Sequence, residues 1–107
     1  MTVRSHRLWG PVRIESTDPQ LVYTVPLGRT VIVKNVRLVE ISGADVDFDV
    51  TVNGSAADDA FFWDEHLPAG KIVVDSTWWV LEQGDEVYVR ASVADALVVW
   101  GSGAVLV

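Results

Sequence analysis

The chain has 107 residues, with eight Lys and Arg against fifteen Asp and Glu, and its formal net charge is −7. Hydrophobic residues make up 50% of the chain and none is cysteine, which excludes general disorder, a disulfide scaffold, a thiolate nucleophile and a cysteine-based zinc site. No apolar run approaches the roughly 18–20 residues of a membrane span, and no hydrophobic stretch follows the basic N-terminus. We therefore expect one soluble domain, made in a cytoplasm, that has no membrane partner.

The charge is distributed unevenly along the chain. The first fourteen residues contain Arg4, Arg7 and Arg13 and no acidic residue. The acidic remainder repels phosphate backbones, so we expect no nucleic-acid partner. The basic N-terminal segment either docks on an acidic surface, including that of another copy of the chain, or only keeps the N-terminus soluble. The sequence leaves both interpretations open.

Two prolines help to place the N-terminal boundary. Pro11 and Pro19 cannot donate to a central strand ladder, so their segment is expected at a sheet edge or as an extended tie. Residues 1–19 are therefore predicted to form an N-terminal arm, and residues 20–107 a β-sandwich domain.

Alternating patterns and turn signals predict strands along most of the chain. Residues 44–52 alternate strictly between hydrophobic and polar side chains and precede Asn53-Gly54, which is typical of a strand and a hairpin turn. The phase shifts near Asn35, which indicates a bulge. A helix is expected only as a turn or two near residues 56–60. In chain order, the candidate strands are 8–14, 21–25, 30–41, 44–52, 60–63, 71–81 with a candidate break at Asp75-Ser76, 87–93 and 97–107.

About eight short strands separated by regular turns are typical of an all-β fold, either a sandwich or a small barrel. We predict an antiparallel, jelly-roll-like β-sandwich behind the extended arm.

Residues that carry chemistry are few. Neither His6 nor His66 lies in a catalytic motif, so we expect no enzyme and no cofactor, with His66 exposed in a loop. Asp45, Asp47 and Asp49 project from one strand face, and calcium binds such carboxylates. Neighbours two residues apart on a strand lie roughly 6.5–7 Å apart and splay. A solvated face without metal is therefore the preferred interpretation, and calcium is the alternative.

Tryptophan is frequent, with five residues in the chain. Trp78 and Trp79 are adjacent, so on a strand they face opposite sides, and Phe61-Phe62-Trp63 poses the same problem. Large aromatic side chains outside the core indicate an interface or a ligand platform. Sugar stacking and coverage by the chain's own loops are alternatives to burial between subunits. The predicted interface residues are Arg4, Arg7, Trp9, Arg13, Trp63, Trp78 and Trp79.

Two stretches resemble structural proteins of tailed-bacteriophage virions. Residues 23–36, YTVPLGRTVIVKNV, resemble the opening of a small sandwich in those proteins, and residues 79–89, WVLEQGDEVYV, resemble the turn before a late strand. With the hairpin at residues 45–54, the similarity spans about residues 20–107. The matching motifs are structural rather than catalytic.

This resemblance implies a non-enzymatic virion component. Our first hypothesis is a capsid decoration or cement protein that self-associates, with a trimer favoured, and stabilises the shell beside the major capsid protein or other virion proteins. It would be made in the host bacterial cytoplasm and reside in the virion. A small tail or baseplate protein and a carbohydrate-binding module with exposed tryptophans are the alternatives.

Overall fold

The computed structural model describes the backbone of residues 3–106 and the side chains of residues 6–106. Nine strands and one short 3-10 helix form the fold. In chain order they are β1 (Val3–Ile14), β2 (Gln20–Thr24), β3 (Thr30–Glu40), β4 (Val46–Val52), η1 (Ala57–Asp59), β5 (Ala60–Leu67), β6 (Ile72–Asp75), β7 (Trp79–Leu81), β8 (Glu86–Ala91) and β9 (Leu97–Leu106).

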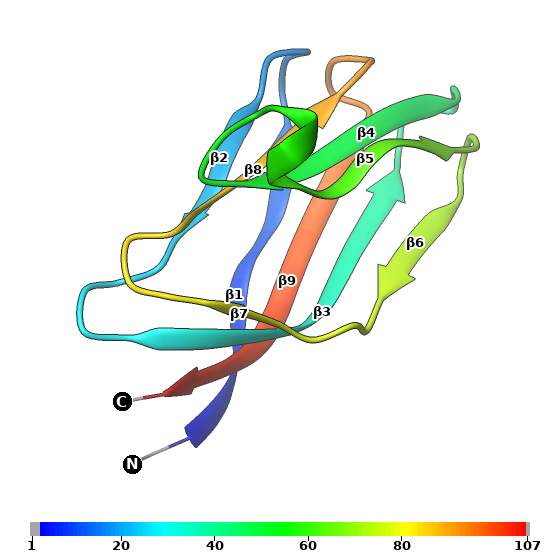
Figure 1. The fold of residues 1–107 in the computed structure, drawn as a ribbon. Helices are drawn as coiled ribbons and strands as arrows, with labels where there is room; N and C mark the ends of the chain where they lie inside the picture. Colours follow the sequence, from blue (N-terminus) through cyan, green and yellow to red (C-terminus); the bar gives the residue numbers. More distant parts are fainter. Residues whose placement is uncertain (1–2, 107) are drawn as a thin grey trace.

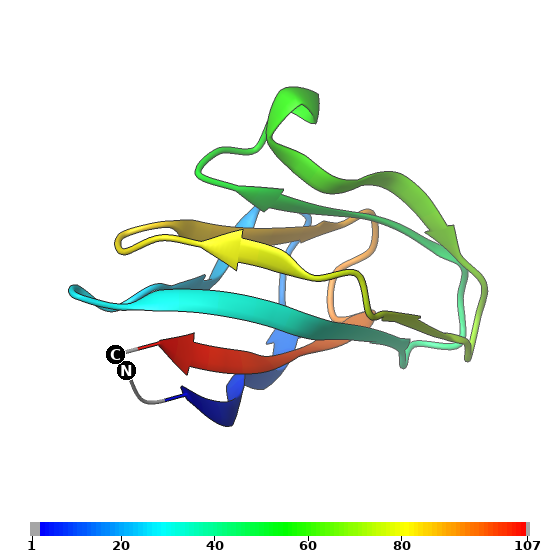
Figure 2. The same ribbon diagram turned by 60° about the horizontal axis from the view of Figure 1, so that its bottom comes forward.

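The strands form two antiparallel sheets that pack face to face (Figures 1 and 2). The first sheet has the order β1-β9-β3-β6, with β7 also paired to β3, and the second has the order β2-β8-β4-β5. If β6 and β7 are taken as one interrupted strand beside β3, each sheet has four positions, as in a jelly roll. The predicted antiparallel sandwich is therefore confirmed.

Local patterns in the sequence placed most of these strands correctly. The break at Asp75-Ser76 separates β6 from β7, and the expected bulge lies between Val33 and Asn35 of β3. The expected helical turn is η1, and Asn53 adopts the positive φ of 61° that a turn residue tolerates. These features follow from side-chain alternation and turn chemistry, which are local properties of the chain.

The N-terminal segment differs from the expected arm. Residues 3–14 form β1, which pairs with β9 and is an edge strand of the first sheet. An edge position agrees with the proline argument, because Pro11 lies within the register shift between Trp9 and Val12. The segment is nevertheless a strand of the sandwich, so the separation into an arm and a domain does not describe this structure.

Trp9 explains why the segment joins the sandwich. Its side chain is 5% exposed and packs in the core, with its ring centroid 5.4 Å from that of Tyr23. The ring lies over Gly101 of β9, where an added Cβ would collide with the indole. The missing side chain at Gly101 thus makes the space for Trp9. Trp9 was expected at an interface, but in this fold it is a core residue.

Candidate functional site

The outer surface of the first sheet has an unusual composition. Along β9 and β3, every second side chain is buried toward the second sheet, and the side chains between them point outward. The pairing register shows which residues of β1, β6 and β7 lie beside these outward side chains and therefore share the outer surface. Among the described strand residues, these outward positions contain no carboxylate. We call this surface the cationic face; its basic members are Arg7, Arg13, Lys34 and Arg37, and its apolar members are Ile32, Val39, Ile72, Val74, Val80, Val98 and Trp100.

The apolar side chains of this face are open to solvent at its β6–β7 edge. Ile72, Val74 and Val80 are exposed, and so is Trp78, which lies in the break between β6 and β7 and is 64% exposed. Lys34 extends over this tryptophan, with Nζ 4.6 Å from the ring centroid. Arg37 makes a similar contact with Trp100 at 5.6 Å. Exposed apolar surface that is bordered by cations is typical of an interaction surface.

The predicted interface residues separate in the structure. Arg7, Arg13 and Trp78 lie on or beside the cationic face, whereas Trp63 belongs to β5 of the second sheet and is 44% exposed. Trp79 points toward the other sheet and stacks on Phe61, with ring centroids 4.2 Å apart. The expectation that Trp78 and Trp79 diverge is confirmed. The side chain of Arg4 lies outside the described residues.

Several members of the face were not predicted from the sequence. Lys34 lies in the β3 bulge, which shifts the side-chain alternation, so Lys34 and Arg37 both point outward although they are three residues apart. In a regular strand, that spacing would place them on opposite faces. Recognising the bulge and applying the parity on each side of it separately would have identified them.

The acidic residues of β4 lie on the opposite side of the molecule. Asp49 was expected on a solvated face, but its side chain is only 3% exposed and pairs with Arg90 of β8, with Nε 2.6 Å from Oδ2. Its Oδ1 accepts the backbone N–H of Asp64 at 2.7 Å. A buried carboxylate needs such partners. The guanidinium of Arg90 supplies the charge, and Asp49 therefore acts as a structural link between β4 and β8.

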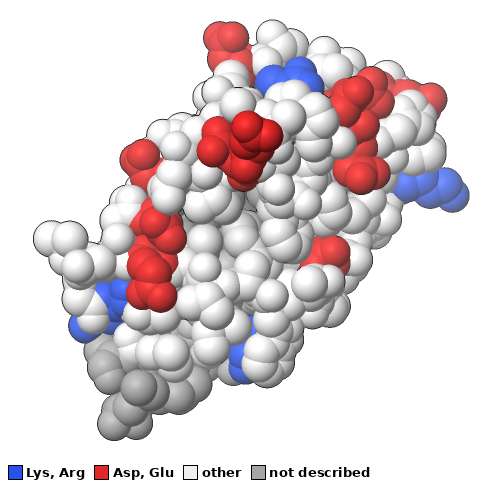
Figure 3. Space-filling model, viewed as in Figure 1, with Lys and Arg blue, Asp and Glu red and all other residues white. Residues whose placement is uncertain are grey.

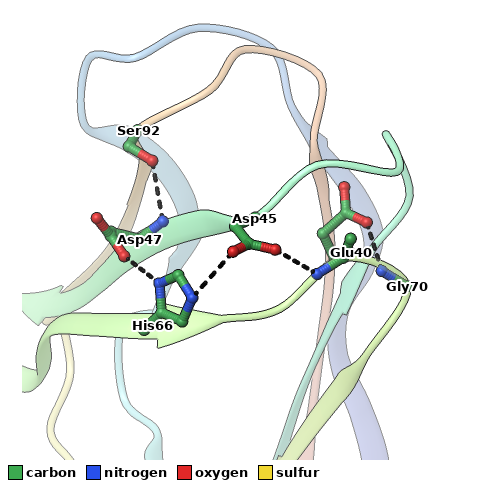
Figure 4. A network of polar contacts seen from close by, with 7 residues as sticks. Glu40, Asp45, Asp47, His66, Gly70 and Ser92 are labelled. Carbon is green, nitrogen blue, oxygen red and sulfur yellow. Dashed lines mark hydrogen bonds and ion pairs between the residues drawn. The ribbon is translucent and has the colours of Figure 1, made fainter.

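His66 is also placed differently from the expectation. It lies in β5 rather than in a loop, and its ring sits between Asp45 and Asp47 (Figure 4). Nδ1 is 2.8 Å from Oδ1 of Asp47, and Nε2 is 3.4 Å from Oδ2 of Asp45. The imidazole of the neighbouring strand lies between these two carboxylates and contacts one oxygen of each. The hydrogen bond to Asp47 raises the pKa of His66 above its ordinary value, and the charge of Asp45 adds to this effect.

A second polar cluster holds the neighbouring turns. Glu40 is buried at the end of β3 and accepts hydrogen bonds from the hydroxyl and N–H of Ser42 and from the N–H groups of Gly43 and Gly70. The Ser42 hydroxyl and then the Gly70 amide lower the pKa of Glu40 to about 2. Asp45 accepts the N–H of Ala69 at 3.0 Å, so this turn is held by both clusters.

The polar side chains of the described residues do not form a metal site. Among the described residues, no group of three or more His, Asp or Glu is placed to hold a metal ion. No helix within residues 3–106 is long and apolar enough to cross a membrane. The surface seen in Figure 3 carries several separate groups of carboxylates and fewer basic side chains.

Comparison with protein-family models and with curated proteins yields no relative. The chain matches no protein-family model, and no curated protein is significantly similar to it in sequence.

Proposed function

We propose that this chain is a non-enzymatic structural subunit of a tailed-phage virion, with capsid decoration as the first choice and a small tail or baseplate role as the second. Its partners would be the major capsid protein or other virion proteins together with further copies of itself, with a trimer favoured. The cationic face with its exposed Trp78 carries this proposal, because it offers aromatic and aliphatic surface next to cations that form no ion pair among the described residues, the usual composition of a docking surface.

Two further arguments support the virion setting. The jelly-roll arrangement is common in viral capsid domains, and residues 23–36 and 79–89 resemble segments of virion sandwiches. Fold does not determine function, so both arguments act by analogy. The cationic face, in contrast, is observed directly in the side chains of this chain.

Immunogold electron microscopy of particles from the phage or prophage that encodes the chain tests the virion setting. Gold on the heads supports decoration, and gold on the tails supports the second choice. Purified particles that carry no label would overturn the proposal.

The docking surface is tested by Trp78→Ala in a particle-binding or oligomerisation assay. Truncation of a true aromatic anchor costs about 2 kcal/mol or more in association. Leu27→Ala is a matched control, because Leu27 is exposed in a turn outside the cationic face. Equal association of both variants would exclude the face as the docking surface.

Trp78 also supports a second candidate function, a carbohydrate-binding module. A solvent-exposed indole ring can stack on a sugar, and jelly rolls also occur in lectin domains. A glycan array separates the two functions. A monomeric chain that binds glycans and loses this binding in the W78A variant would favour the carbohydrate module over the virion subunit.

A further inference from the structure

Three irregular backbone segments line up across the first sheet. The bulge of β3 at Val33–Asn35 faces the break between β6 and β7 on one side and Ser102-Gly103 of β9 on the other. Beyond β9, the register of β1 shifts after Arg7. Bulges frequently redirect side chains toward functional sites. Here they produce a shallow pocket of about 260 Å³, lined by His6, Lys34, Ser102 and Gly103.

The polar groups in this pocket have no ionic partner within the described chain. All ion pairs among the described residues lie elsewhere in the molecule, and their cations are His66 and Arg90. The ammonium of Lys34 contacts the ring of Trp78 instead, and the hydroxyl of Ser102 makes no side-chain hydrogen bond among the described residues. The pocket therefore presents a cation and a hydroxyl donor beside an aromatic ring, a combination suited to a carboxylate.

Carboxylates are concentrated elsewhere on the same chain. Residues 45–65, which form β4, η1 and the first part of β5, contain seven Asp and Glu and no Lys or Arg. Asp58, Asp64 and Glu65 are exposed, and Asp59 is partly exposed. This acidic hairpin belongs to the second sheet, whereas the pocket lies on the first. The charges of the two surfaces are complementary.

We propose that the pocket receives a carboxylate from the acidic hairpin of a second copy of this chain. The inference rests on the self-association included in the proposed function and names the surfaces that carry it. Because two different surfaces meet, the contact is heterologous, so it closes into a ring such as a trimer when the rotation allows. Val74 of β6 and Val80 of β7, on the same face, are exposed aliphatic residues, and this composition suits a protein partner better than a sugar.

Sedimentation equilibrium at low and high salt tests the proposal with the full chain. We expect reversible association that weakens with salt, because the contact pairs charges at an exposed site. Lys34→Glu should weaken it by at least about tenfold. Lys71→Glu is the matched control, since it makes the same charge change at an exposed lysine outside the cationic face. Circular dichroism verifies that each variant remains folded.

A charge exchange within one chain provides the decisive comparison. The variant D58K/E65K should associate as weakly as K34E, and the triple variant K34E/D58K/E65K should regain most of the wild-type association, because the opposed charges are restored in reverse. Failure of the triple variant to recover would overturn the proposed pairing.

The remaining outcomes separate this inference from the proposed function. Strong association that K34E and K71E change equally would overturn the pocket contact and leave the virion proposal standing. A wild-type chain that stays monomeric would overturn the contact between copies, while immunogold labelling independently decides the virion setting. Binding of an acidic glycan by that monomer, lost in K34E, would assign the pocket to a sugar instead.

Discussion

Replacing Arg90 by Met should destabilise the protein by leaving a buried carboxylate without its counter-charge. The side chain of Asp49 is 3% exposed, and its Oδ2 accepts a hydrogen bond from Nε–H of Arg90 at 2.6 Å. Methionine keeps much of the length of arginine and its contact with the sheet but removes every donor. Among the described residues, the only other hydrogen bond to the Asp49 carboxylate comes from the backbone N–H of Asp64.

The expected loss follows from the geometry of the pair. Charge centres roughly 4 Å apart in an effective dielectric of about 20 attract by about 4 kcal/mol. Arg90 is 32% exposed in its side chain, so water screens part of this attraction. We expect R90M to lower the free energy of unfolding by about 2–3 kcal/mol. For a domain of this size, that corresponds to a decrease in Tm of roughly 8–15 °C.

Urea denaturation followed by tryptophan fluorescence measures this loss. Arg29→Met is the control, since Arg29 is exposed in a turn and forms no ion pair among the described residues. Adding Asp49→Asn to R90M should recover about 1–2 kcal/mol, because the uncompensated charge is removed. The reasoning is refuted if R90M costs no more than R29M, or if the double variant is less stable than R90M.

Three other predictions concern single residues. The ionised Glu40, whose pKa is lowered from 4.5 to about 2, stabilises the fold above pH 4.5, and this contribution is lost as the pH falls toward 2. Thermal melts should therefore show a shallower acid dependence of stability for E40Q than for the wild type. Gly103→Ala should cost about 3 kcal/mol in urea denaturation, because a Cβ there would collide with the backbone oxygen of Ile32; an unchanged midpoint would contradict this. The pKa of His66, followed by NMR, should lie above 6.5 and fall in D47N; its stabilising contribution is complete below 6.5 and is lost as the pH rises through the folded-state pKa.

Much of the fold was predictable because strand formation leaves a local signal. The strict alternation in residues 44–52 corresponds to β4, and the phase shift near Asn35 corresponds to the β3 bulge. The divergence of Trp78 and Trp79 also required only strand parity. In each case, the pattern of neighbouring residues along the chain is enough to make the prediction.

The functional surface was only partly predictable. Arg7, Arg13 and Trp78 were recognised by composition, but their meeting with Lys34 and Ser102 depends on which strands pair. The order of strands in a sandwich is set by packing over the whole chain. Composition alone therefore identified basic and aromatic residues without showing which of them share a face.

The sequence by itself determined the all-β class, the positions of most strands and the sign of the charge along the chain. Side-chain alternation, turn residues and ionisable groups are local properties of the sequence and need no tertiary contact to be recognised. Only the tertiary structure decided the places of Trp9 and Asp49. Trp9 enters the core because Gly101, more than ninety residues away, lacks a side chain, and Asp49 is buried because Arg90 pairs with it across two strands. A residue's burial depends on partners that the fold brings to it, and those partners are distant in the sequence.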